Sequence, residues 1–161
     1  MSDLELLIPE WIPGIISAVT ETIAELDMPD AIAIGCYVAL FDFIRPEPLY
    51  IFNIGNFRTK MQERVCIEYC LEKGRRLQLH PEHISSYQTR DFLTKPWQCG
   101  GAVRGSEIIL SCAGFPELKD ELAMIRAGLR IGRFPSDNHV RDIANLSENM
   151  DIYHLLKSLA V

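Results

Sequence analysis

The sequence of 161 residues lacks the motifs that most often identify an enzyme. It contains no G-x-S-x-G nucleophile elbow, and none of its cysteines lies in a recognised catalytic signature. It also contains neither G-x-G-x-x-G nor a Walker A sequence, so nucleotide binding through either motif is unsupported. The sequence therefore identifies no reaction by itself.

Positive charge is scarce as well. Sixteen Lys and Arg residues stand against 22 Asp and Glu residues, which gives a net charge of −6. Binding a nucleic-acid backbone needs clustered cations, so this balance excludes nucleic acid as the main partner. The densest basic stretch, residues 73–76, is expected to be the solvated end of a helix.

Disulfide patterns and long apolar runs are absent too. The five cysteines include no C-x-x-C pair, which argues against a disulfide framework. Cys66 and Cys70 could share a metal but are interpreted as reduced, partly buried thiols, and Cys99 is the best candidate for a reactive thiol. The acidic start does not resemble a signal peptide, and no uninterrupted apolar run approaches 18 residues. We therefore expect a cytoplasmic protein without a membrane partner.

The residues that are present fit one domain over residues 1–161. A composition of 48% apolar and 24% charged residues is typical of a globular chain with its own core. Periodicity predicts a helix, two strands, a helix, an irregular segment, two strands, a helix and a helical tail. The expected segments are 9–26, 31–43, 49–54, 59–74, 77–95, 100–113, 116–132 and, for the tail, 133–161. Pro135-Ser136-Asp137 is a helix-start signal within the tail. Antiparallel strands covered by helices make an α+β architecture.

Two packing faces are expected in more detail. Along the strand 31–43, one of the two alternating sets of residues consists mostly of small side chains. A helix should therefore pack closely on the face of the sheet that this set forms. Gly74 is expected to end the second helix. The expected buried stripe of that helix is Met61, Val65, Tyr69 and Leu77.

A resemblance to a known family covers about three quarters of the chain and is carried mainly by residues 100–129. The features are Gly100-Gly101, the apolar strand 108–113, the turn 114–118, Asp120-Glu121 and the helix to Leu129. Together they resemble the GlcG/HbpS-type family of small α/β proteins. The resemblance implies a profilin-like fold over residues 1–132, with residues 133–161 as a helical extension. Members of the family are often labelled haem-binding, but the predicted first helix here holds no histidine to match a family ligand, so the resemblance leaves the cofactor of this chain open.

A candidate ligand site surrounds Arg104. Its guanidinium could clamp a carboxylate through two hydrogen bonds, and the backbone at Gly100 and Gly101 could approach a ligand closely. Ser111 could add a hydroxyl group. The alternatives are an arginine in a surface ion pair and a buried serine bonded to the backbone.

His80 and His83, with Glu82 between them, form the nearest approach to a ligand cluster. Imidazole nitrogens suit zinc, iron or haem iron. Because no cysteine follows at zinc-site spacing, the alternative is a pair of solvated or hydrogen-bonded loop histidines. His139 and His154 are interpreted as surface groups.

Three functions remain open. The first is a ligand-binding or sensory module of the GlcG/HbpS-like type, with a small carboxylate or a tetrapyrrole as ligand. The second is an assembly protein without a small-molecule ligand, and the third is a small-molecule enzyme using Arg104 and His80 or His83. The two apolar faces of the first strand and the amphipathic tail predict a homodimer or larger closed oligomer.

Overall fold

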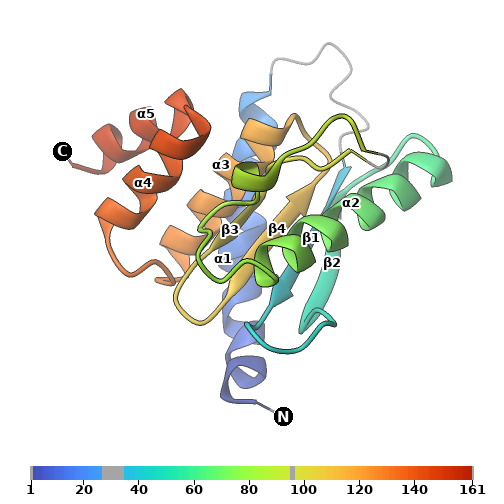
Figure 1. Cartoon of the computed structure of the whole chain (residues 1–161), viewed down its shortest axis with the longest axis horizontal. Helices are drawn as coiled ribbons and strands as arrows, with labels where there is room; N and C mark the ends of the chain where they lie inside the picture. Colours follow the sequence, from blue (N-terminus) through green and yellow to red (C-terminus); the bar gives the residue numbers. More distant parts are fainter. Residues whose placement is uncertain (1, 27–34, 95–96, 161) are drawn as a thin grey trace.

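A four-stranded antiparallel sheet with helices on both faces forms the centre of the protein (Figure 1). The computed structural model describes residues 2–26, 35–94 and 97–160. The strands, in the spatial order β2-β1-β4-β3, are β1 Gly35–Phe41, β2 Tyr50–Gly55, β3 Ala102–Arg104 and β4 Ile109–Ala113. The helices are α1 Asp3–Glu25, α2 Lys60–Gln78, α3 Glu117–Arg130, α4 Asp137–Ser147, α5 Met150–Leu159 and the short 3-10 helix η2 Ser86–Thr89. The predicted α+β class is confirmed.

The two faces of the sheet are covered by different helices. Cys36, Val38 and Leu40 of β1 join the core formed with α1 and α3. Ala39 and Phe41 alternate with them and join a second core beneath α2. The prediction of close helix packing on the small-residue face is therefore confirmed for β1. The first four residues of the predicted strand lie outside the described residues.

Helix α1 begins earlier than the expected residue 9. Ser2 and Glu5 form a capping box that starts the helix, and Pro9 and Pro13 both lie inside it. By length and composition, α1 is the one helix among the described residues that could span a membrane, with a mean hydropathy of 1.2 over its most apolar window. Core helices of soluble proteins share these properties, and one face of α1, including Ile15, is buried in the main core.

Helix α2 continues past the expected end at Gly74. Gly74 lies where α2 crosses the sheet, and an added Cβ there would be 2.1 Å from a ring carbon of Phe41. The glycine is thus explained by close packing inside the helix, and the helix runs on to Gln78. Gly74 therefore allows close packing against Phe41 and does not end the helix.

The expected buried stripe of α2 is wrong at its start, because Met61 and Val65 are exposed. The residues that face the sheet are instead Cys66, Cys70, Lys73, Gly74 and Leu77. The expectation of a solvated basic stretch holds for Arg75, which is exposed, but is wrong for Lys73 and Arg76, whose side chains are only 3% and 7% exposed. Both cations have polar partners in the interior, which compensate for their loss of water.

The tail forms two helices that pack on α3. Ser136 caps α4 by accepting a hydrogen bond from the His139 N–H, which confirms the helix start predicted there. Apolar residues of α4 and α5, such as Ile143 and Ile152, belong to the main core. The two helices lie outside α3, on the side away from α2 (Figure 1).

Candidate functional site

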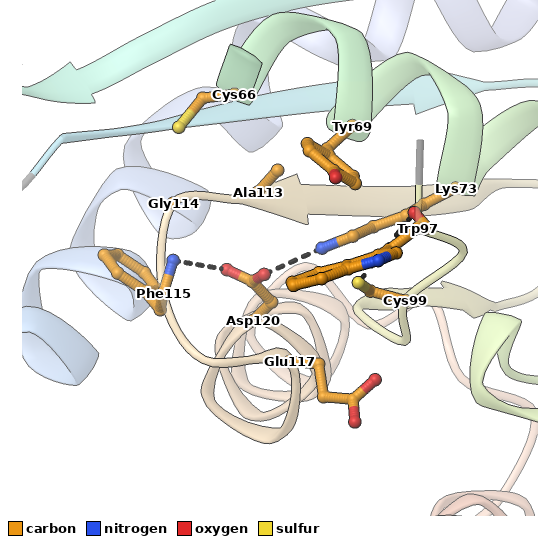
Figure 2. A pocket seen from close by; sticks show the side chains of 10 residues that line it. All are labelled: Cys66, Tyr69, Lys73, Trp97, Cys99, Ala113, Gly114, Phe115, Glu117 and Asp120. Atoms are coloured by element: carbon orange, nitrogen blue, oxygen red, sulfur yellow. Dashed lines mark hydrogen bonds and ion pairs between the residues drawn. The ribbon is translucent and has the colours of Figure 1, made fainter. Parts of the chain in front are cut away.

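A cavity of about 300 Å³ opens at one end of the sheet, between α2 and the beginning of α3 (Figure 2). It lies where β4 ends and the chain turns through Gly114 into α3. Three aromatic side chains and two thiols contribute to its surface, together with three charged groups. The lining residues are Cys66, Tyr69, Lys73, Trp97, Cys99, Ala113, Gly114, Phe115, Glu117 and Asp120.

An ion pair between Lys73 and Asp120 forms the polar part of this surface. The Lys73 ammonium on α2 points toward the Asp120 carboxylate on α3, and Nζ lies 2.8 Å from Oδ2 (Figure 2). Nζ also donates a hydrogen bond of 2.9 Å to the carbonyl oxygen of Cys112. The pair connects the helices on opposite faces of the sheet. Because both side chains are almost fully buried, neither charge has water as an alternative partner.

The surroundings keep this pair charged at neutral pH. Burial raises the pKa of Asp120 to about 6, against the opposing effect of the Lys73 ammonium and of a hydrogen bond from the Phe115 N–H. Burial lowers the pKa of Lys73, but the charge and hydrogen bond of Asp120 outweigh it, so that this pKa is raised overall. Lys73 is therefore an ammonium group, which can donate hydrogen bonds but cannot act as a nucleophile.

The predicted glycine pair lies next to these charges. Gly101 has φ +123°, and an added Cβ would lie 2.7 Å from the Asp120 Cβ and 2.8 Å from Lys73 Nζ. Gly100 donates its N–H to Glu117 Oε2 at 2.8 Å. Gly101 thus leaves room for the ion pair, and Gly100 positions a second carboxylate of the cavity. The expected close approach exists, and it is made by side chains of this chain.

The two thiols of the cavity are not activated. Burial raises the pKa of Cys66 to about 11 and also raises the pKa of Cys99. A thiol must lose its proton to act as a nucleophile, and both groups keep theirs at neutral pH. The structure therefore offers no support for Cys99 as a reactive thiol.

Arg104 has a different position from the one expected. It does not line the cavity, and its guanidinium donates to the carbonyl oxygens of His83 at 2.7 Å, Leu77 at 2.5 Å and His80 at 3.1 Å. It also stacks over the ring of Phe43, 4.8 Å from its centroid. These contacts fasten the end of α2 and the following turn to β3. Neither an exposed anion clamp nor a surface ion pair describes this arginine.

The remaining predicted residues are also apart from the cavity. The Ser111 hydroxyl donates to the Cys70 carbonyl oxygen at 2.7 Å, which joins β4 to α2, as its structural alternative predicts. His80 and His83 lie in the turn after α2, beside Arg104. The structure therefore divides the six predicted residues among three places. Only Gly100 and Gly101 adjoin the cavity.

The sequence interpretation missed Lys73 and Asp120. A signal for Lys73 was present, because Cys66, Cys70, Lys73 and Leu77 follow one another at intervals of four, three and four residues. A lysine on an apolar helical stripe requires a buried partner or a path to solvent. No comparable signal identifies Asp120 as that partner, because it lies 47 residues further along the chain.

Comparison of the chain with family models, with curated proteins and with solved structures gives no match, so no family is identified.

Proposed function

We propose that the protein is a small-ligand-binding or sensory module whose ligand occupies the cavity beside Lys73 and Asp120. The observation that carries this proposal is a buried ammonium group at the surface of a cavity with aromatic residues around it. Ligand sites commonly combine apolar and aromatic walls with a few fixed polar groups. Tyr69, Trp97 and Phe115 would contact the apolar part of the ligand.

The polar groups favour a ligand with a single carboxylate or carbonyl group. An ammonium group has three donors, and among the described residues Lys73 uses them for Cys112 and Asp120. One donor is thus left for an acceptor on the ligand. The nearby carboxylates of Asp120 and Glu117 disfavour a ligand with several negative charges. The cavity is at the small end of ligand pockets, which favours a small carboxylate over a tetrapyrrole.

Binding is favoured over catalysis by the protonation of the cavity groups. The pKa values of Cys66, Cys99 and Lys73 are all raised, so none of these groups is a nucleophile at neutral pH. The enzyme alternative also depended on Arg104, whose guanidinium donates to backbone carbonyl groups. We therefore retain the ligand-binding function as the stronger proposal.

The relationship to the GlcG/HbpS-type family, with its profilin-like fold, remains a proposal. The element order α1–β1–β2–α2–β3–β4–α3 supports it. The two further helices α4 and α5 would then be an addition that completes the core around α3.

Self-association is a second proposal, and the edge of the sheet favours it. β2 is an edge strand in the order β2-β1-β4-β3, and its residues Tyr50 and Ile51 are exposed, as are Phe43 and Ile44 nearby. An exposed edge with apolar residues pairs readily with another strand. We propose a second copy of this chain as the partner. Sedimentation of a dimer at tens of micromolar supports this proposal, and a monomer alone at about that concentration contradicts it.

The ligand-binding proposal can be tested with simple aromatic probes. Calorimetric titration with benzoate, indole-3-acetate and the neutral benzyl alcohol should show that the carboxylates bind about tenfold more tightly than the alcohol, which corresponds to about 1.4 kcal/mol. Cys99→Phe, which fills the cavity with a ring, should abolish binding. Val65→Phe adds the same ring at an exposed position of α2 and should leave binding unchanged. Absence of carboxylate binding, or equal binding by Cys99→Phe, contradicts the proposal.

A further inference from the structure

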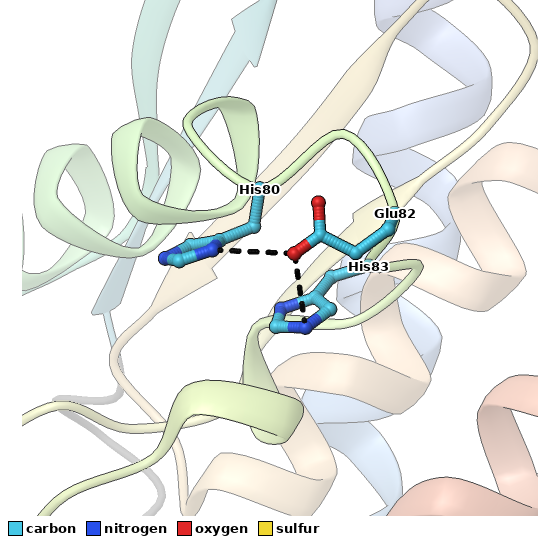
Figure 3. Close-up of side chains that lie close together, drawn as sticks. All are labelled: His80, Glu82 and His83. Atoms are coloured by element: carbon cyan, nitrogen blue, oxygen red, sulfur yellow. Dashed lines mark ion pairs between the residues drawn. The ribbon is translucent and has the colours of Figure 1, made fainter.

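Three side chains with metal-ligating atoms lie together in the turn that follows α2 (Figure 3). Glu82 Oε1 is 3.5 Å from His80 Nδ1 and 3.5 Å from His83 Nε2, and the three ligand atoms lie within 4.8 Å of one another. We propose that His80, Glu82 and His83 bind a divalent first-row transition-metal ion such as Zn²⁺. This site is separate from the cavity and does not depend on the function proposed for it.

The distances place the ligand atoms close to the spacing that one ion requires. Zinc bonds to imidazole nitrogen and carboxylate oxygen are about 2.0–2.2 Å long, so ligands of the same ion are about 3–4 Å apart. Both distances from the Glu82 oxygen already satisfy this condition. Two imidazoles and one carboxylate would leave a coordination position for water, as in zinc sites that are open to a substrate.

Binding requires one of the imidazole rings to turn. The His80 and His83 rings are stacked, with centroids 4.9 Å apart and planes inclined by 16°. A metal ion lies near the plane of each imidazole that binds it, so two parallel rings cannot both direct a nitrogen at one ion. His83 Nδ1 is buried and has no hydrogen-bond partner among the described residues. Turning the His83 ring therefore breaks no hydrogen bond at this nitrogen.

The backbone that carries the three ligands is held in place without the ion. Arg104 donates to the carbonyl oxygens of both histidines, and the His83 N–H donates to the His80 carbonyl oxygen at 2.9 Å. Fixing the turn in advance reduces the conformational entropy that metal binding would otherwise cost. This role also gives a reason for a half-buried arginine at this end of β3.

The side chains remain accessible to an ion from solution. The His80 and Glu82 side chains are 42% and 66% exposed, while His83 forms the inner side of the cluster at 21%. An entry path is one of the requirements for a metal site. The same exposure means that His80 and Glu82 can be replaced with little effect on the core.

Titration of the metal-free full-length protein with ZnCl₂ by calorimetry tests the proposal. We expect one ion per chain, and a cobalt absorption spectrum typical of nitrogen and oxygen ligands when CoCl₂ is used instead. His80→Ala, His83→Ala and Glu82→Gln should each weaken zinc binding at least about tenfold. His154→Ala, which removes an exposed histidine of α5, should not change it.

Two results would overturn the proposal. One is the absence of zinc binding by the wild-type protein, and the other is binding of equal affinity by the wild type and by His80→Ala. Because Glu82 is exposed, Glu82→Gln provides a variant that keeps its fold even if His83→Ala does not. Circular dichroism of each variant establishes which of them are folded. Zinc should also raise the Tm of the wild type and not that of Glu82→Gln, because a ligand that binds the native state stabilises it.

Discussion

Asp120 and Glu121 are neighbours on α3 and both are buried, but they face different regions of the molecule. Asp120 faces the cavity and forms an ion pair with Lys73 of α2. Glu121 lies between the tail and the start of η2, and its carboxylate accepts hydrogen bonds from the Ser147 hydroxyl and the Asn149 side chain of the tail and from the Ser85 hydroxyl before η2. Burial raises the pKa of both carboxyl groups.

The difference separates the proposed ligand site from a junction between helices. The carboxylate of Glu121 accepts hydrogen bonds from three neutral side chains of the protein, and it lines none of the cavity beside Lys73. Lys73 and Asp120 border a cavity and combine a full positive with a full negative charge there. Buried ion pairs contribute little net stability compared with apolar residues. A role of this pair in recognition belongs to the proposed ligand-binding function.

Breaking the ion pair on one side should have the largest effect. Lys73→Met leaves the Asp120 carboxylate buried without its counter-charge, and we expect a loss of roughly 3–5 kcal/mol in the free energy of unfolding. The double variant Lys73→Met/Asp120→Asn removes both charges and should regain most of this loss. Urea unfolding measures both values. Equal free energies of unfolding for the single and the double variant would contradict an energetic coupling between the Lys73 and Asp120 charges.

Removing the carboxylate of Glu121 should have the next largest effect. Glu121→Ala takes the acceptor from the buried Ser85 hydroxyl, whereas Ser147 and Asn149 keep the carbonyl oxygens of Ile143 and Leu118 as second acceptors. The variant should therefore cost roughly 1–3 kcal/mol. Glu121→Gln keeps an acceptor and should cost much less. In Glu121→Ala, the rate of hydrogen exchange should increase more in α4 and α5 than in β1. Uniform exchange along the chain would show that Glu121 does not hold the tail in place.

The pH dependence of stability should distinguish the two carboxyl groups. The pKa of Asp120 is raised from 3.8 to about 6 in the folded state, so the folded protein binds this proton more tightly than the unfolded chain. The stabilisation present below about pH 4 is therefore lost as the pH rises toward 6, by roughly 3 kcal/mol at about 1.4 kcal/mol for each pKa unit.

The double variant Lys73→Met/Asp120→Asn should lack this loss, whereas Glu121→Gln should retain it. Glu121→Gln should remove only the contribution of Glu121, which has the same sign because its pKa is also raised. Urea unfolding at a series of pH values from 4 to 7 gives the comparison. Parallel curves for the wild type and the double variant would contradict the raised pKa of Asp120.

An exposed charge on the same helix should have the smallest effect. Lys119 precedes Asp120 and forms a partly exposed ion pair of 2.7 Å with Asp151 on α5. Surface pairs contribute about 0–1 kcal/mol, so Lys119→Ala should lower the free energy of unfolding by less than about 1 kcal/mol. Thermal unfolding checks this value. A loss of stability as large as that of Glu121→Ala would contradict the expectation that burial of the charged side chain sets the size of the loss.

Much of the fold could be predicted from the sequence, because it depends on local periodicity. The order of helices and strands and the helix start at Ser136 both follow from local sequence patterns. One error arose where a distant contact overrides a local signal, because Gly74 suggests a helix end but fits against Phe41. The other arose from a local signal that was overlooked, because Pro9 suggests a helix start but the capping box of Ser2 and Glu5 begins the helix earlier.

The candidate site was predictable only in part. Gly100 and Gly101 indicated a close approach of other groups, and such an approach is found at the Lys73–Asp120 pair. Lys73 was misread because the basic residues around it suggest a solvated helix end. Its burial depends on Asp120, which is far away in the sequence and is brought near by the packing of α2 and α3 on opposite sides of the sheet.

The Lys73 ammonium group itself offers the most direct test of ligand binding in the cavity. Heteronuclear NMR of the lysine ammonium groups should show one slowly exchanging signal at neutral pH, from Lys73, because this group is buried and hydrogen-bonded. We predict that benzoate shifts this signal in the wild type and in Val65→Phe, but not in Cys99→Phe. A Lys73 signal that benzoate leaves unchanged in the wild type would contradict the account.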